Sequence, residues 1–145
     1  MAHAQGRRGH GGKRFFVADL RHTRRRQLVV QTREKPAEVD PKDGRVLWEQ
    51  PVEAFHGMNI LTPVAYRDML FTSTYGGRTF GFKVSYAGDR STVSEVWRHK
   101  AQGYTSTPVM IDGVAYTRLR SQRVMAAELT TGRELWTSDQ SFGKC

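Results

Sequence analysis

The stretches DGRVLWE, residues 43–49, and TGRELWT, residues 131–137, carry a glycine, an arginine and a Leu-Trp pair at the same spacing. A third tryptophan, Trp97, lies between Trp48 and Trp136. Recurrence at about 40 to 50 residues is the length of a β-propeller blade or of a helical solenoid unit. The chain is therefore predicted to be a repeat protein, and the type of repeat decides its fold.

A shift of the sequence by 45 residues brings one copy of this repeat onto the next without a gap. The tryptophans are the exception, because Ser85–Thr92 in the earlier copy corresponds to a shorter LTTG connection in the later one. We interpret Ser85–Thr92 as an inserted loop. Under the shift, the aligned pairs are Pro63 with Pro108, Val64 with Val109, Phe71 with Tyr116, and Arg78 with Arg123.

Short runs rich in Val, Tyr, Phe and Thr alternate with turn residues through both copies, which is typical of β-strands. The first copy contains TPVAY, MLFTST, RTFGFKVS and VSEVWRHK, and the second contains STPVMI, VAYTRLR, RVMAAEL and ELWTSD. Asp112-Gly113 between two apolar runs indicates a tight hairpin. No window keeps apolar residues at helical spacing for three turns, so we predict an all-β protein.

Four antiparallel strands cannot bury both faces alone, whereas four-stranded units packed around an axis bury them against each other. We expect about two complete blades and most of a third, an incomplete β-propeller. Residues 27–52 would form the partial blade, with FFVADL as the candidate for its first strand. Residues 59–100 and 104–139 would form the complete blades, and 140–145 would begin another.

The segments VDPKDGRVLWE and AELTTGRELWT resemble the repeat of the pyrroloquinoline-quinone-like (quinoprotein-like) β-propellers, and the likeness covers roughly residues 27 to 142. The resemblance implies that the glycine makes the tight turn into the outermost strand and that the tryptophan docks between blades. A tryptophan buries up to about 250 Å² and its indole N–H needs a partner, which suits such an interface. The structural repeat residues are then Gly44, Trp48, Pro63, Trp97, Pro108, Gly132 and Trp136.

The same repeat serves quinone-dependent alcohol and glucose dehydrogenases and the lipoprotein scaffold of outer-membrane protein assembly, so the fold does not choose between them. The dehydrogenases are recognised by adjacent cysteines over the quinone, a calcium site of Glu and Asn, and an Asp base. This chain has one cysteine, Cys145. We therefore expect no catalytic residue and no cofactor in this chain. Pyrroloquinoline quinone and calcium enter only if the chain is a fragment of such a dehydrogenase.

The net charge of +9 is concentrated near the start of the chain. Residues 1–26 form a basic Gly/His/Arg-rich leader, which we expect to be poorly ordered, and residues 27–145 hold 15 basic against 13 acidic side chains. A nucleic-acid footprint is normally spread over one face of the fold. Nucleic acid is therefore an unlikely partner, to be sought at the leader alone.

Other kinds of site find little support in the sequence. His56 and His99 recur at nearly the repeat distance, but they lack the close ligand spacing of a metal site, so none is predicted. No stretch approaches the roughly 20 apolar residues of a membrane-spanning helix, and no signal peptide is visible. The family resemblance nevertheless points to the periplasm or cell envelope.

Loops at the ends of blades usually carry recognition on such a scaffold, and we expect them to bind a protein partner or further blades of the same propeller. The candidate partner-binding residues are Tyr75, Tyr86, Arg118 and Arg120. We therefore expect a non-catalytic propeller segment that serves as a protein-binding or assembly scaffold in the bacterial cell envelope. The alternative is a fragment of a quinone-dependent dehydrogenase whose cofactor residues lie outside this chain.

Overall fold

Three four-stranded antiparallel sheets make up the computed structural model, which describes residues 16–20, 27–32, 34–53, 61–103 and 106–143. In this part of the chain all regular structure is β-strand, as the sequence predicts. Blade 1 contains β1 (Phe16–Leu20), β2 (Gln27–Gln31), β3 (Pro36–Val39) and β4 (Val46–Glu49); blade 2 contains β5 (Val64–Tyr66), β6 (Met69–Ser73), β7 (Thr79–Ala87) and β8 (Arg90–His99); blade 3 contains β9 (Val109–Ile111), β10 (Val114–Arg118), β11 (Val124–Glu128) and β12 (Glu134–Thr137).

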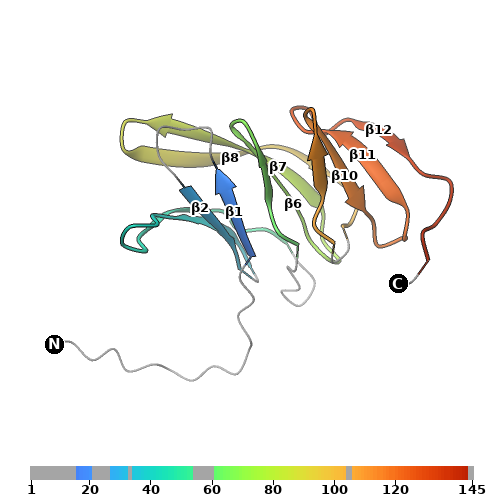
Figure 1. Cartoon of the computed structure of the whole chain (residues 1–145), viewed down its shortest axis with the longest axis horizontal. Coiled ribbons are helices and arrows are strands. Elements are labelled where there is room, and N and C mark those ends of the chain that lie inside the picture. Colours follow the sequence, from blue (N-terminus) through green and yellow to red (C-terminus); the bar gives the residue numbers. More distant parts are fainter. Residues whose placement is uncertain (1–15, 21–26, 33, 54–60, 104–105, 144–145) are drawn as a thin grey trace, which may run out of the picture.

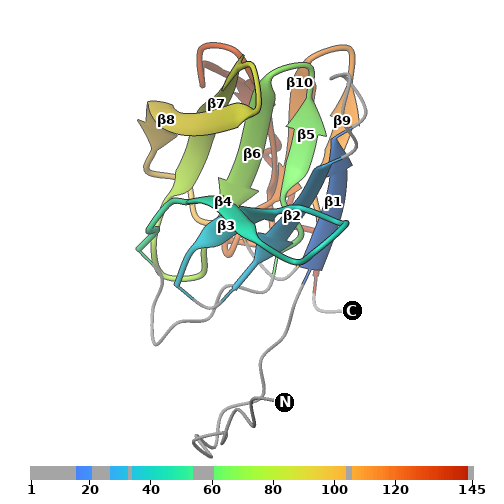
Figure 2. The ribbon, with the colours of Figure 1, turned by 90° about the vertical axis from the view of Figure 1, so that its left-hand side faces the viewer.

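The blades follow one another in chain order, and each pairs its strands as a simple meander (Figure 1). The first strands of successive blades touch, β1 with β5 and β5 with β9, while β4 contacts β8 on the outer side. Figure 2 shows blade 1 packed beside blade 2, with blade 3 behind them. This arrangement is that of consecutive propeller blades.

Two boundaries in the structure differ from those expected from the sequence. The stretch Ser85–Thr92, interpreted as an inserted loop, instead belongs to β7 and β8, which pair as far as Ala87 and Arg90. The insertion is therefore an extended hairpin with a two-residue turn, because its residues continue the ladder on both strands (Figure 1). Strand β8 also contacts β4 of blade 1. Residues 16–20 of the assigned leader form β1 in the FFVADL stretch, which gives blade 1 four strands; residues 1–15 lie outside the described part.

The predicted hairpin at Asp112-Gly113 is confirmed. Both residues have positive φ, 47° and 79°, as a type I′ turn requires, and β9 and β10 pair directly around them. The turn that precedes the fourth strand is the same in blades 1 and 3. Asp40 N–H and Gly44 N–H bond to the carbonyls of Arg45 and Asp40, and Glu128, Gly132 and Arg133 reproduce this pattern.

A bulge recurs at one place in every blade, in the pairing of the third strand with the fourth. Each bulge sits beside a row of four paired residues that crosses the whole sheet and ends at the tryptophan. We call these the tryptophan rows: Ala18–Val29–Glu38–Trp48 in blade 1, Val64–Phe71–Gly81–Trp97 in blade 2, and Val109–Tyr116–Ala126–Trp136 in blade 3.

The hydrophobic core lies between the blades. The buried members of the tryptophan rows of blades 1 and 2 pack against the next blade, so the apolar area that a single sheet would expose is removed from water at the junction. Complete burial of one phenylalanine side chain there contributes about 1.5 to 3 kcal/mol. The buried residues between blades 1 and 2 are Val29, Trp48, Val52, Leu70, Phe80, Phe82 and Val84, and those between blades 2 and 3 are Met69, Phe71, Ala115 and Leu129.

Candidate binding surface at one end of the blades

Three connections meet at one end of blades 2 and 3. Ser73 pairs with Thr79, and Thr79 with His99, so the β6–β7 turn and the start of the β8–β9 connection share this end. A bridge between Gly103 and Leu119 brings the β10–β11 turn to the same place. The strand pairing therefore brings residues from three separate parts of the chain together at this end of blades 2 and 3.

Two buried hydroxyl groups hold these connections together. The Oγ atom of Ser73 lies 2.8 Å from Oγ1 of Thr79 and accepts the N–H of Gly103 at 2.6 Å. Thr79 in turn donates to the carbonyl oxygen of Ala101 at 2.8 Å. Gly103 must be a glycine, because a Cβ there would come within 3.0 Å of Ser73. Buried and saturated hydrogen bonds of this kind make the surrounding loops rigid.

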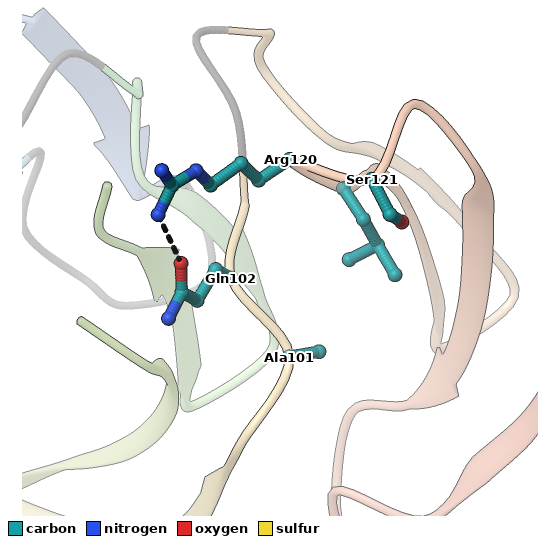
Figure 3. Close-up of a pocket in the computed structure, with 5 residues that line it drawn as sticks. Ala101, Gln102, Arg120 and Ser121 are labelled. Carbon is teal, nitrogen blue, oxygen red and sulfur yellow. Dashed lines mark hydrogen bonds between the residues drawn. The ribbon is translucent and has the colours of Figure 1, made fainter. Parts of the chain in front are cut away.

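Arg120 is the central side chain of this surface. Its backbone N–H donates to the carbonyl of Gln102 at 2.9 Å, and its Nη1 lies 3.4 Å from Oε1 of Gln102 (Figure 3). The guanidinium carbon lies 4.9 Å from the ring centre of Tyr75. A contact of this kind between an exposed arginine and a half-buried tyrosine contributes about 0.5 to 1 kcal/mol, enough to orient both side chains.

An open hollow of about 480 Å³ adjoins Arg120. Its volume falls in the range of ligand pockets, about 300 to 1,000 Å³, and its mouth is wide. The lining is apolar at Ala101 and Leu119 and polar at Gln102, Arg120 and Ser121. The residues that line it are Ala101, Gln102, Leu119, Arg120 and Ser121 (Figure 3). Such a shallow, mixed surface suits a side chain of another protein.

The structure brings two of the four predicted partner-binding residues together and separates the others. Tyr75 and Arg120 form the contact described above. Arg118 instead donates from Nη2 to the carbonyls of Phe142 at 3.0 Å and Gly143 at 2.8 Å, so it holds the segment after β12. Tyr86 lies near the β7–β8 turn, at the opposite end of the sheet. We define the blade-end surface as Tyr75, Gln102, Leu119, Arg120 and Ser121.

The tryptophans occupy equivalent places in three different environments. Trp97 crosses the junction of blades 2 and 3, where its Nε1–H donates to the carbonyl of Leu129 at 2.6 Å. Its indole ring covers Gly132, where a Cβ would come within 3.0 Å of the ring. Trp48 is buried between blades 1 and 2, whereas Trp136 on blade 3 is 48% exposed.

The remaining repeat residues lie at element ends. Gly44 and Gly132 have φ of 76° and 71°, a left-handed conformation that favours glycine. Pro63 and Pro108 are buried directly before β5 and β9, where a missing N–H does not interrupt the ladder. Of the histidines considered for a metal, His56 lies outside the described residues. His99 accepts the N–H of Ala101 at Nδ1, and its Nε2 lies 3.6 Å from Glu134.

Sequence reasoning missed one buried charged group, Glu38. Its carboxylate oxygens, Nε1 of Trp48 and Oγ of Ser91 are buried, and among the described residues none makes a regular hydrogen bond. Burial raises the pKa of Glu38, the nearby Ser91 hydroxyl and Trp48 indole oppose the rise, and the charge of Asp40 adds to it. The register equates Glu38 with Gly81 and Ala126, a relation visible only once the bulges are known.

Two kinds of feature are absent from the part of the chain that the structure describes. Nowhere in it do three His, Cys, Asp or Glu side chains gather as metal ligands would. It also holds no helix of the length and hydropathy that crossing a membrane requires. The arrangement thus offers rigid, exposed polar and aromatic groups on a repeat scaffold.

Fold and site together define a β-propeller repeat protein of the quinoprotein-like type, present here as a partial propeller of three blades. Residues 5–138 match the model of the family described as outer membrane protein assembly factor BamB. The chain belongs to this family. The quinoprotein-like resemblance seen in the sequence is thereby confirmed.

Solved structures show the same fold at low sequence identity. The crystal structure of BamB from Moraxella catarrhalis is 18% identical, with a TM-score of 0.59, and the match covers 79% of this chain and 38% of that protein. A europium-containing methanol dehydrogenase is 13% identical, with a TM-score of 0.58 and coverage of 77% and 23%. A quinohemoprotein alcohol dehydrogenase from Pseudomonas putida is 15% identical, with a TM-score of 0.56 and coverage of 85% and 22%.

The chain therefore spans between about a fifth and two fifths of the length of these proteins. Among curated protein sequences, none gave a significant match.

Proposed function

We propose that this chain is a non-catalytic protein-binding scaffold of the bacterial cell envelope, which binds a protein partner through the blade-end surface. The observation that carries the proposal is the contact of Arg120 with Tyr75 and Gln102 beside an open hollow. Arginine and tyrosine are enriched at protein interfaces, because both combine a large contact area with directional hydrogen bonds. The family description, an outer membrane protein assembly factor, supports this role and this location.

The rigidity of the site supports binding rather than turnover of a small molecule. The loops are fixed by buried hydroxyl groups, so little conformational freedom is lost when a partner docks. The hollow is wide and only partly apolar, which fits an inserted side chain better than an enclosed substrate. Because Arg120 is cationic and exposed, a partner with an acidic or carbonyl-rich segment is the best match.

Site-specific photocrosslinking in the source cells tests this function. A photoreactive residue at position 120 should capture a discrete envelope protein, and one at position 86, at the other end of blade 2, should not. Arg120→Ala should reduce capture from a photoreactive residue at position 75, whereas Arg90→Ala, an exposed arginine near the opposite turn, should leave it unchanged. Equal capture from both ends, or no effect of Arg120→Ala, would contradict the proposal.

Quinone-dependent oxidation is the second candidate, because the fold is equally similar to two dehydrogenases. The residues of this chain do not fit a quinone cofactor with its calcium ion. The chain has a single cysteine, Cys145, where the resemblance calls for an adjacent pair, and the described residues assemble no carboxylate cluster for calcium. Addition of pyrroloquinoline quinone with calcium tests the point directly. A saturable shift of the quinone absorbance would favour the dehydrogenase reading, and an unchanged spectrum the scaffold.

A further inference from the structure

Blade 1 departs from the repeat at the residue that is paired with its tryptophan. The register pairs Trp48 with Glu38, where the other two blades have Gly81 and Ala126 beside their tryptophans. In blade 2 this position has to be small, because a Cβ on Gly81 would lie within 3.0 Å of the Trp97 ring. Blade 1 therefore places a carboxyl group where the other blades have a hydrogen atom or a methyl group.

Blade 2 departs from the repeat on the other side of the same junction. Its third and fourth strands, β7 and β8, contain 9 and 10 residues, whereas those of blades 1 and 3 contain 4 or 5. Strand β6 pairs with β7 only as far as Lys83, so residues 84–93 form a two-stranded hairpin extension. The hairpin extension packs on blade 1, because Val84 belongs to the core cluster of Trp48 and Val93 packs against that cluster.

The two departures meet at a buried polar cluster of Glu38, Trp48 and Ser91. Ser91 pairs with Tyr86, two residues before Val93 and on the same face of β8, which is turned toward blade 1. Glu38 is fully buried, and its carboxylate oxygens, Ser91 Oγ and Trp48 Nε1 make no regular hydrogen bond among the described residues. A carboxylate enclosed in this way lacks the bonds that would replace its hydration, so burial favours the neutral acid.

The surroundings of Glu38 favour its neutral form. Burial is the largest effect and raises the pKa of Glu38, whereas Ser91 and Trp48 oppose the rise and the like charge of Asp40 adds to it. Asp40 itself lies 3.9 Å from Arg45, which is 67% exposed at its side chain. The closed junction therefore holds a carboxyl group that binds its proton more tightly than a glutamate in water does.

Other charged groups on these strands are paired or turned away. Glu95 lies on the face of β8 that is turned toward blade 1, but Arg98 bonds to it at 2.7 and 2.8 Å and lowers the pKa of Glu95, so its charge stays constant while Glu38 titrates. Arg90 pairs with Ala87 on the opposite face of the hairpin extension. Further pairs in blades 1 and 2, and between blades 2 and 3, are Lys35 with Glu49, Lys83 with Asp68, and His99 with Glu134.

We propose that Glu38 and the hairpin extension form a proton-controlled latch between blades 1 and 2. The hairpin extension lies closed over the neutral carboxyl group, and it lifts from blade 1 when Glu38 gives its proton to solvent water. Lifting lets water reach the carboxylate and uncovers Val84, which is 2% exposed in the closed form. The four-stranded part of blade 2 stays folded, because the hairpin extension is paired only with itself.

The latch lies at the opposite end of blade 2 from the blade-end surface, so the two proposals stand or fall separately. Tyr86, predicted from the sequence to bind a partner, belongs to the hairpin extension and pairs with Ser91. Opening of the latch would therefore move Tyr86 together with the apolar side chains beneath it. In this way the acidity of the surroundings would control how much of this face is open to other molecules.

Hydrogen exchange of the full chain, followed by mass spectrometry from about pH 4 to about pH 8 and corrected for intrinsic exchange rates, tests the proposal. The closed form binds one proton more than the open form above the ordinary glutamate pKa of about 4.3. Amide protection of residues 84–93 should therefore fall by up to about tenfold for each pH unit. It should level off above the folded-state pKa, while the amides of blade 3 keep their protection.

Two substitutions remove the titrating group in different ways. Glu38→Gln keeps the size of the side chain, and Glu38→Ala reproduces the residue that blade 3 has at Ala126. Either variant should make the protection of the hairpin extension independent of pH. Glu34→Gln, at an exposed position, should retain the pH dependence of the original chain. Circular dichroism reports whether each variant keeps its β-sheets.

Three results would overturn the proposal. The first is protection of residues 84–93 that does not change with pH in the original chain. The second is a pH dependence that persists in both Glu38→Gln and Glu38→Ala, because another group would then be titrating. The third is an equal loss of protection in all three blades, because the chain would then open as a whole and not at the latch. The first and third need no variant, so they decide the question even if a substitution prevents folding.

Discussion

The indole ring of Trp97 in blade 2 covers Gly132 in blade 3 so closely that a Cβ on Gly132 would lie within 3.0 Å of three of its atoms. The same ring donates its N–H to the carbonyl of Leu129 at 2.6 Å. A single side chain therefore joins two sheets by shape and by a directed hydrogen bond.

Substitution of Gly132 by alanine should lower the free energy of unfolding by about 2 to 4 kcal/mol, from overpacking and left-handed backbone strain together. The control is Gly88→Ala, because Gly88 has a similar φ of 60° but open space around it. It should lose only about 1 to 2 kcal/mol. Urea unfolding of both variants measures the difference. Equal losses in the free energy of unfolding would show that the contact with the Trp97 ring does not contribute to the effect.

Gly81→Ala should also weaken the junction of blades 2 and 3, although its backbone is not left-handed. The added methyl group would meet Trp97 from within its own blade and displace the ring, at a cost of about 1 to 3 kcal/mol. Near-ultraviolet circular dichroism should change with the ring position. The reverse substitution Ala126→Gly, at the equivalent site beside exposed Trp136, should cost only about 0.5 to 1 kcal/mol.

The buried Glu38 should make stability fall as the pH rises. Because the pKa of Glu38 is raised in the folded state, the folded protein binds its proton more tightly than the unfolded chain does. The contribution of protonated Glu38 to the free energy of unfolding is complete below the ordinary glutamate pKa of about 4.3. This contribution is lost as the pH rises through the folded-state pKa. Glutamine cannot ionise, so the stability of Glu38→Gln relative to that of the original chain should increase as the pH rises across this interval.

Urea titrations at a series of pH values compare the two proteins. Glu34→Gln, at an exposed position, serves as the control and should follow the original pH profile. If the free energy of unfolding of Glu38→Gln falls with pH as steeply as that of the original chain, the carboxyl group of Glu38 is not the source of this pH dependence.

A buried hydrogen bond also links blade 1 to blade 2, since Oγ1 of Thr72 donates to Oε1 of Gln31 at 3.1 Å. Thr72→Val keeps the shape but leaves the amide oxygen of Gln31 without this partner. The loss should be about 1 to 3 kcal/mol in chemical denaturation. The same substitution at exposed Thr92 should change stability by no more than about 0.5 kcal/mol, and a similar result at both positions would contradict the assignment.

The sequence by itself determined the class of fold and the unit that repeats. Alternating apolar residues, the Asp112-Gly113 turn and the Gly-Arg-x-Leu-Trp segments are local signals, because strand and turn preferences depend on neighbouring residues. They predicted the all-β class and the strands of blades 2 and 3, together with the quinoprotein-like family. The Ser85–Thr92 boundary was wrong because turn residues within that stretch do not prevent pairing on either side of the actual turn.

Only the tertiary structure decided which residues meet. The contact of Tyr75 with Arg120 joins positions that are distant in the chain, and the separation of Tyr86 from them follows from strand direction. The bulges set Glu38, Gly81 and Ala126 at one position, each paired with the tryptophan of its blade, and all three are buried. The physical reason is that packing between sheets depends on register and on the neighbouring blade, and neither is encoded by residues close in sequence.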